Sequence, residues 1–310
     1  MVREATVTPS STTNPTKVGV QLPEVEREVR WPELRDMARA AEAVGFDSIW
    51  VGDHLLYRDP GIGARAPWEA WSVLAALAAV TDRVELGPLV ASVSFHNPAM
   101  LAKKAATVDE ISGGRLILGL GAGWNEVEYR AFGFPFDHRV DRFEEAFTII
   151  RGLLRDGHVD FAGRWYEARD CELLPRPARQ VPMMVGTVGE RMLRLAAAHA
   201  DAWNAWFTWF GNRPEGAAAL RAKLDSACKE VGRDPATLAR TVAVLVQVGG
   251  GEVPRRGGPE ETVEPILAEE LGGQLAEFAA EGIGHVQLVI DPITVRSIER
   301  LGGLLGSGRR

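Results

Sequence analysis

Eight short apolar runs, each followed by a helical pattern, are the feature that most constrains the fold of this chain. Each run is almost continuously apolar, as expected for a strand whose two faces are both covered. Eight such units, with no second block of different composition, predict an α/β fold, a (β/α)8 (TIM) barrel, in preference to an open doubly wound sheet. The expected strands are 18–22, 48–52, 84–90, 116–120, 182–185, 202–205, 241–248 and 285–290.

The expected helices alternate with these strands, and only the interval between the fourth and fifth strands is unusually long. We interpret residues 157–180, approximately, as an insertion there, with a hairpin that pairs 159–161 with 165–167 across 162–164. Residues 17–305 then form one domain, preceded by a flexible tail at 1–16. The expected helices are 32–44, 68–80, 98–111, 140–155, 190–199, 214–231, 264–281 and 294–304.

Composition excludes several classes of function. The chain has 35 Lys and Arg against 42 Asp and Glu, so it has no basic excess to neutralise the phosphates of a nucleic acid. Its two cysteines, Cys171 and Cys228, have neither a disulfide framework nor a Cys-x-x-Cys metal spacing, and we expect no metal site. Its apolar runs are shorter than the ~20 residues that cross a bilayer, and residues 1–16 contain no secretion signal. We expect a cytoplasmic protein without membrane or nucleic-acid partners.

The carboxyl ends of the strands are where a barrel of this kind places its chemistry. Asp53 and His54 follow the second strand, where a carboxylate beside an imidazole could orient a ligand and move a proton. Alternatively, Asp53 caps the next turn and His54 packs against it. The apolar loop 91–98 after the third strand either lines a site or packs beneath its neighbour.

Three glycines at alternate positions, Gly119, Gly121 and Gly123, mark the end of the fourth strand. Such glycines indicate a close approach to the backbone, by a flat ring or by a crowded barrel layer. Their spacing matches a dinucleotide fingerprint only loosely, so we predict no Rossmann site. Glu126 and Glu128 follow; both can be first-turn helix acids, and we prefer that explanation for Glu128.

Two later strand ends complete the candidate site. Gly186, Thr187 and Gly189 precede a helix, where backbone N–H groups and the helix dipole suit an anion such as phosphate, although a capping box would look similar. Trp203, Trp206 and Trp209 follow the sixth strand, and they form either core or the apolar wall of a substrate pocket.

Several longer motifs follow one another along the chain. They are GFDSIWVGDH at 45–54, NP at 97–98, LAKKAAT at 101–107, SGGRL at 112–116, GLGAGW at 119–124, RVDRFEE at 139–145 and ADAWN at 200–204. In this order, over about residues 18–290, they resemble the bacterial luciferase-like monooxygenase superfamily. Within it, the chain is most similar to the branch that uses the deazaflavin coenzyme F420; the branch that uses FMN is the alternative.

The resemblance implies a cofactor lying across the barrel mouth and assigns roles to matching positions. Asp53 matches a cofactor contact and His54 the acid/base position. The third-strand bulge, often a cis non-proline peptide against the ring, matches Leu89 and Val90, with Ala91 next to them. Gly121 and Gly123 match the close approach to the ring, and the phosphate-binding turn matches Gly186, Thr187, Val188 and Gly189.

One departure from the family pattern concerns the proton donor. Sugar-phosphate dehydrogenases of the F420 branch carry a glutamate where this chain has Trp124, so that donor is absent or moved to Glu126. Trp124 and Trp206 favour a small, apolar organic substrate. The predicted reaction is hydride transfer between F420 and that substrate, with His54 exchanging the proton.

Three other functions remain alternatives. An FMN monooxygenase would use dioxygen and a separate reductase that supplies reduced flavin. A cofactor-free lyase or aldolase would need a Schiff-base lysine near a strand end, and the sequence places its lysines elsewhere. A non-catalytic flavin carrier would need the anion turn but not Asp53 and His54. The resemblance also implies a homodimer.

Overall fold

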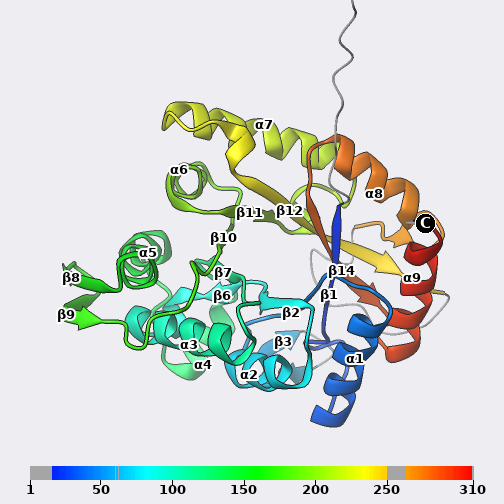
Figure 1. Ribbon diagram of the computed structural model, residues 1–310, viewed down its shortest axis with the longest axis horizontal. Coiled ribbons are helices and arrows are strands. Elements are labelled where there is room, and N and C mark those ends of the chain that lie inside the picture. The colour runs from blue at the N-terminus through cyan, green and yellow to red at the C-terminus, as the bar shows by residue number, and fades with distance from the viewer. Residues whose placement is uncertain (1–15, 60, 62, 250–262, 309–310) are drawn as a thin grey trace, which may run out of the picture.

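The computed structural model describes residues 16–59, 61, 63–249 and 263–308, and their parallel strands form a barrel surrounded by helices (Figure 1). The strand order is β5-β2-β1-β14-β12-β11-β10-β7-β6. Pairing of β6 with β7 and a bridge between Leu86 and Leu116 bring the two ends of this order together, which confirms the barrel rather than the open sheet. The strands are β1 (Lys17–Gln21), β2 (Ser48–Val51), β5 (Glu85–Pro88), β6 (Ala91–Ser92), β7 (Leu118–Gly121), β10 (Met183–Gly186), β11 (Ala202–Ala205), β12 (Ala239–Gln247) and β14 (His285–Asp291).

Two helices, α2 and α3, begin at side-chain caps in the sequence. Asn97 accepts a hydrogen bond from the Met100 N–H at the start of α3, and the Glu69 carboxylate caps α2. The predicted helix at 264–281 is too long, because β13 (Ile266–Leu267) first extends the sheet beside β12. The helices are α1 (Trp31–Ala43), α2 (Ala70–Val80), α3 (Pro98–Ile111), α4 (Glu126–Phe132), α5 (Arg139–Asp156), α6 (Glu190–His199), α7 (Pro214–Glu230), α8 (Leu271–Ala280) and α9 (Val295–Gly308).

Polar side chains, rather than apolar ones, fill much of the barrel interior. The Asn204 side-chain amide donates to Thr241 Oγ1 at 2.8 Å and to Gln287 Oε1 at 2.9 Å. Nearer the amino ends of the strands, Ser48 Oγ lies 2.7 Å from His285 Nε2. These polar layers fill the barrel below the carboxyl ends of its strands, which is the end where barrels of this kind place their sites.

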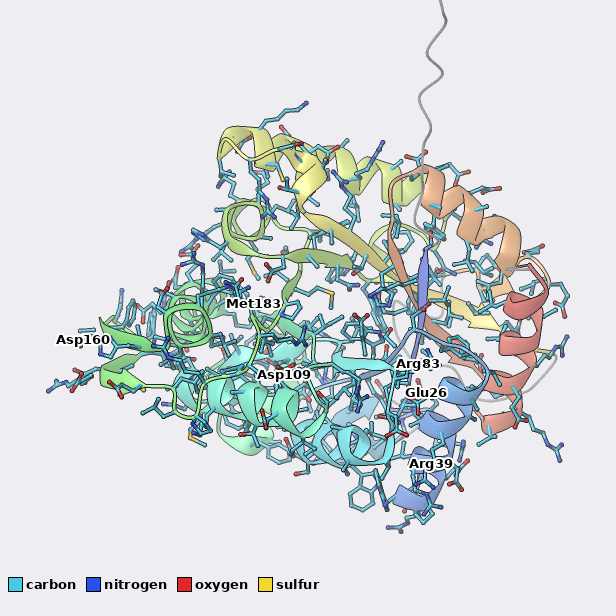
Figure 2. The ribbon with its side chains drawn as sticks, in the orientation of Figure 1. Glu26, Arg39, Arg83, Asp109, Asp160 and Met183 are labelled. Carbon is cyan, nitrogen blue, oxygen red and sulfur yellow. The ribbon has the colours of Figure 1, made fainter. Side chains whose placement is uncertain are left out.

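Two hairpins lie outside the barrel. β8 (His158–Ala162) and β9 (Glu167–Glu172) pair in the expected interval, with Asp160 at the edge of the molecule away from the barrel (Figure 2). Trp165 and Tyr166 lie in its turn and not in a strand, because the Glu145 carboxylate accepts from their backbone N–H groups. The second hairpin, β3 (Tyr57–Asp59) with β4 (Gly63–Arg65), was not predicted, although Asp-Pro-Gly at 59–61 is a turn signal.

Several expectations concern features that the described residues address only in part. The tail at 1–16 lies outside them except for Thr16. None of the helices in the described part of the chain combines the length and hydrophobicity that crossing a bilayer requires. Within the same ranges, His, Cys, Asp and Glu side chains nowhere gather in a group of three or more that could hold a metal ion.

Candidate active site

The Val90 side chain packs over Gly121 and Gly186 at the barrel mouth. The Leu89–Val90 peptide is cis, as the family resemblance implies, and it separates β5 from β6 where one strand was predicted. A Cβ added to Gly121 would lie 2.6 Å from Val90 Cγ2, and one added to Gly186 would lie 3.3 Å from both Val90 methyl carbons. These glycines therefore make room first for Val90, whose half-buried side chain can then present a face to a ligand above it.

Gly123 is explained by a different contact. Its φ is +77°, and an added Cβ would lie 1.8 Å from the Tyr129 hydroxyl and 2.4 Å from Ser92 Oγ. Those two hydroxyls are 2.7 Å apart, and the Tyr129 hydroxyl donates to the Ala122 carbonyl at 3.0 Å. Burial raises the pKa of Tyr129 to about 12, so it remains a neutral phenol. Protein contacts alone therefore require glycine at position 123.

His54 is paired with Glu128, which lies on α4 across the barrel mouth. Nδ1 of His54 is 2.8 Å from Glu128 Oε1, and Glu128 Oε2 accepts from the Leu55 N–H at 2.7 Å. The Glu128 side chain is 1% exposed, whereas that of His54 is 18% exposed. The sequence suggested only a first-turn helix acid at Glu128. In the structure, Glu128 also holds His54, which is the more exposed residue of the pair.

Asp53 has different hydrogen-bond partners from its neighbour His54. Its Oδ2 accepts from the Ser92 N–H at 2.9 Å and lies 2.8 Å from Nε2 of His96. Asp53 is buried, and His96 is nearly so. The sequence did not single out His96, although the apolar loop 91–98 that contains it was expected to line something. Asp53 therefore ties the end of β2 to the loop after β6.

Glu126, the suggested replacement proton donor, is placed differently from Glu128. Its side chain is 53% exposed and pairs with Arg130 one turn further along α4 at 2.8 Å. Trp124, in contrast, lies beside His54, with ring centroids 5.7 Å apart, and it is itself 63% exposed. Of these two predicted residues, the structure brings only Trp124 to His54.

A buried acid that the sequence did not reveal lies close to this group. Glu24, in the loop after β1, accepts from Gln21 Nε2 at 2.6 Å and from the Tyr57 hydroxyl at 3.2 Å. The ring centroids of Tyr57 and His54 are 4.8 Å apart. Gly52 is needed here, because its Cβ would lie 1.4 Å from Glu24 Oε1. A glycine before Asp53 was the one available signal.

The turn from β10 into α6 contains the residues that the sequence suggested for an anion site. The N-cap of α6 is Gly189, which has no side chain to accept from the first turn of the helix. Thr187 Oγ1 accepts from the Gly189 N–H at 3.3 Å, and the Thr187 carbonyl accepts from Trp203 Nε1 at 2.7 Å. Val188 between them is half-buried. Trp203 is therefore core, whereas Trp206, packed on Phe207, is half-buried after the end of β11.

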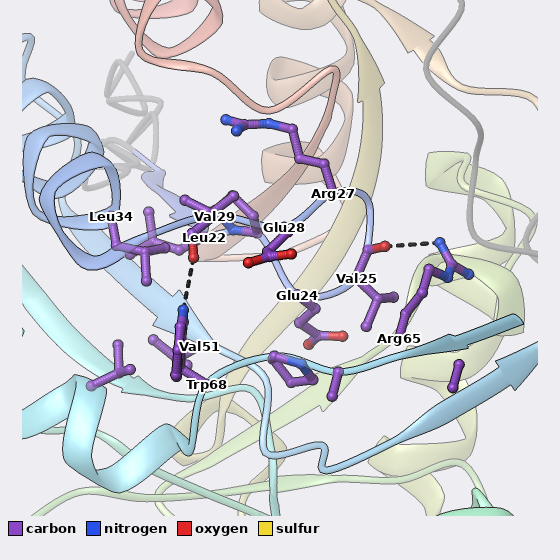
Figure 3. A pocket seen from close by; sticks show the side chains of 15 residues that line it. Leu22, Glu24, Val25, Arg27, Glu28, Val29, Leu34, Val51, Arg65 and Trp68 are labelled. Carbon is purple, nitrogen blue, oxygen red and sulfur yellow. Dashed lines mark hydrogen bonds between the residues drawn. The ribbon is translucent and has the colours of Figure 1, made fainter.

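A cavity of about 410 Å³ opens beside Glu24. It lies between the loop after β1, the end of β4 and the first turns of α1 and α2 (Figure 3). Glu24 belongs to its wall, and so does Val51, two residues before Asp53. This volume is within the range of small-molecule pockets.

Comparison with known proteins identifies the family. The family described as luciferase-like monooxygenase matches residues 10–253 of the chain. This chain belongs to that family. The family resemblance, from which the cis peptide was expected, is thereby confirmed.

Curated relatives that are similar to this chain include F420-dependent enzymes and a monooxygenase. An F420-dependent glucose-6-phosphate dehydrogenase of Amycolatopsis mediterranei is 37% identical over 175 residues, 54% of this chain and 51% of that protein. The pyrimidine monooxygenase RutA of Allorhizobium ampelinum is 32% identical over 176 residues, 54% of this chain and 46% of that protein. The chain thus spans about half the length of the curated relatives it matches.

A solved structure supports the fold across nearly the whole chain. An F420-dependent secondary alcohol dehydrogenase, in complex with an F420-acetone adduct, superposes with a TM-score of 0.80 at 22% identity. The superposition covers 96% of this chain and 100% of the alcohol dehydrogenase chain. At this identity the likeness establishes the barrel and leaves the reaction to be argued from the residues.

Proposed function

We propose that this chain is an F420-dependent oxidoreductase that transfers a hydride between the cofactor and a small, apolar organic substrate. The observation that carries this proposal is the partly exposed His54, held by the buried Glu128 at the mouth of a barrel whose family includes F420-dependent enzymes. The similarity to F420-dependent relatives supports the choice of cofactor, and Trp124 supports the choice of an apolar substrate.

The residues at the mouth fit a deazaflavin. Val90, with Leu89 and Ala91 beside it, offers an apolar face over Gly121 and Gly186, as a flat ring requires. The turn from Gly186 through Thr187 and Val188 to Gly189 would hold the phosphate at the uncapped start of α6. When bound, the cofactor supplies the ring carbon that accepts or donates the hydride. Asp53 would support this arrangement from below through its bond to the Ser92 N–H.

His54 would exchange the proton that accompanies the hydride. A carboxylate can only accept, so His54 donates from Nδ1 to Glu128, and Nε2 is the ring nitrogen that would face the substrate. In the oxidising direction Nε2 takes the proton of the substrate hydroxyl as the hydride leaves the carbon, and in the reducing direction it returns that proton to the carbonyl oxygen. Trp124 and Trp206 would contact the apolar part of the substrate.

The test is a pair of titrations, with F420 and with FMN, followed by tryptophan quenching. We expect F420 to bind, and His54→Ala to keep this binding while losing about 100- to 10,000-fold in turnover over a panel of small alcohols and ketones. Glucose 6-phosphate should not be a substrate, because Trp124 replaces the expected acid. Unchanged turnover in His54→Ala would refute the assignment of His54.

The alternative with specific support is an FMN-dependent monooxygenase, because RutA is also a relative. Binding of FMN without F420 would favour it, together with a separate reductase. Binding of neither would favour a cofactor-free lyase, and F420 binding without any turnover would favour a carrier. We further propose a cytoplasmic homodimer, to be tested by cell fractionation and by light scattering.

A further inference from the structure

The cavity beside the barrel mouth has a wall that is charged at some positions and apolar at most others. Arg27 pairs with Glu33 through a 2.9 Å bond, and Arg65 pairs with Asp59 at 2.6 Å. Glu28 pairs with Arg30 at 2.5 Å. Because these charges already have partners, a charged ligand would have to compete with existing ion pairs.

Apart from Glu24, the remaining wall is apolar. It includes Leu22, Val29, Leu34, Val51 and Val73, all of them buried side chains of the barrel edge, α1 and α2. The indole N–H of Trp68 donates to the Val29 carbonyl at 2.7 Å, so its ring also offers only an apolar surface (Figure 3). Such a wall recognises a neutral, apolar group.

The cavity shares residues with the surroundings of His54. Glu24 lines it and bonds to the Tyr57 hydroxyl, and the Tyr57 ring contacts the ring of His54. Val51 lines it at the end of β2, from which the chain continues to Asp53 and His54. Glu24 and Tyr57 therefore lie between His54 and this cavity, and a molecule whose reacting carbon lies at His54 would extend into it by displacing the Tyr57 side chain.

We propose that the cavity is a subsite for the hydrocarbon part of a neutral substrate, such as the alkyl chain of an alcohol or ketone. The proposal rests on the proposed function and names the part of the substrate that determines specificity. Each methylene buried in such a wall contributes ~0.8 kcal/mol, so affinity should rise about four-fold per methylene until the cavity is full.

Binding can be tested without turnover. Unbranched 2-alkanones from 2-butanone to 2-nonanone are titrated into the F420-loaded protein and into the protein without cofactor, with isothermal calorimetry as the readout. We expect the dissociation constant to fall about four-fold per added methylene in both forms. Dissociation constants that do not change with chain length, or no binding, would overturn the proposal.

Two cavity-filling variants locate the binding. Val73→Phe fills the cavity from α2, and Ala64→Trp fills it from the β3–β4 hairpin, where Ala64 is exposed and the fold tolerates change more readily. Both should weaken 2-octanone binding at least ten-fold. The matched control, Ala222→Trp, places the same bulk on an exposed position of α7. Thermal melts confirm folding, and unchanged binding in both folded variants would overturn the proposal.

The outcome separates this inference from the proposed function. If F420 binds and His54→Ala abolishes turnover while the filled variants keep the KM values of wild type, the function stands and the subsite is wrong. If the alkanones bind and the filled variants lose them but F420 does not bind, the proposed function fails and the cavity remains a site for neutral ligands.

Discussion

Oε1 of Glu128 lies 2.8 Å from Nδ1 of His54, although 74 residues separate them in the sequence. The contact forms because β2 and β7 end at the same face of the barrel, so that the loop after β2 meets α4. Two further bonds fix that loop, from the Leu55 N–H to Glu128 and from the Asn125 amide to the Leu56 carbonyl. His54 is therefore oriented by α4 and not by its neighbour Asp53.

Replacing the acid tests this orientation. In Glu128→Gln the side chain can donate as well as accept, so His54 is no longer restricted to the form with its proton on Nδ1. We expect kcat to fall about 10- to 1,000-fold with little change in F420 affinity. ¹⁵N NMR of the imidazole should show a mixture of tautomers. Glu128→Asp should recover part of the rate.

The matched control is Glu126→Gln in the same helical turn. Glu126 contacts Arg130 on the exposed surface, so its substitution should leave kcat, KM and the imidazole spectrum unchanged. If Glu126→Gln loses the activity and Glu128→Gln keeps it, Glu126 is the proton donor after all.

The contact between Val90 and Gly121 gives a second prediction. Gly121→Ala would place a methyl 2.6 Å from Val90 Cγ2 and force the short, branched side chain to move. We expect a loss of about 1–3 kcal/mol in the free energy of unfolding, and weaker F420 binding. The double variant Gly121→Ala/Val90→Ala should recover most of the stability. Gly284→Ala, directly before the start of β14, is the control, because its Cβ would meet nothing within 4 Å.

The start of α6 gives a third prediction. Thr187→Val removes the hydroxyl that accepts from the Gly189 N–H and that would order the proposed phosphate turn. We expect F420 to bind about 10- to 100-fold more weakly if the hydroxyl also donates to the phosphate, since hydrogen bonds to charged groups contribute ~1.5–3 kcal/mol. A deazaflavin without the phosphate should bind both proteins equally. An equal loss for both ligands would place the phosphate elsewhere.

The barrel could be predicted from the sequence because each strand is a local apolar run. Strand-end residues such as His54 and Thr187 were found for the same reason, since their place follows directly from the strand before them. The split of the third strand at Leu89 was expected only from the family resemblance. The start of the hairpin strand β9 was missed because the Glu145 carboxylate, from α5, determines the turn.

The partners of the site residues could not be predicted in this way. Glu128, His96 and Glu24 reach the site from other strand ends, and no local pattern distinguishes a buried acid from an exposed one. Glu126 and Glu128 are equivalent in sequence, and only the packing of α4 determines which one is buried. Alternating glycines were also ambiguous, because Gly121 makes room for Val90 and Gly123 for Tyr129.

The last prediction concerns acid stability and His285. Burial, together with the nearby Lys17 ammonium, lowers the pKa of His285 to about 3, against the opposing effect of Asp47. Below pH 6.5 the unfolded chain therefore takes up a proton that the folded chain refuses, and stability falls as the pH decreases from about 6.5 toward 3. At pH 5 the loss in the free energy of unfolding from this group is about 2 kcal/mol.

Urea unfolding at pH 7.5 and pH 5.0 measures this loss. This range lies above the carboxylate titrations of Glu42 and Glu69, whose pKa values are lowered. His285→Gln should remove about 2 kcal/mol from the difference in the free energy of unfolding between the two pH values. The exposed His158→Gln should keep the full difference, and an unchanged slope in His285→Gln would show that His285 is not the group responsible.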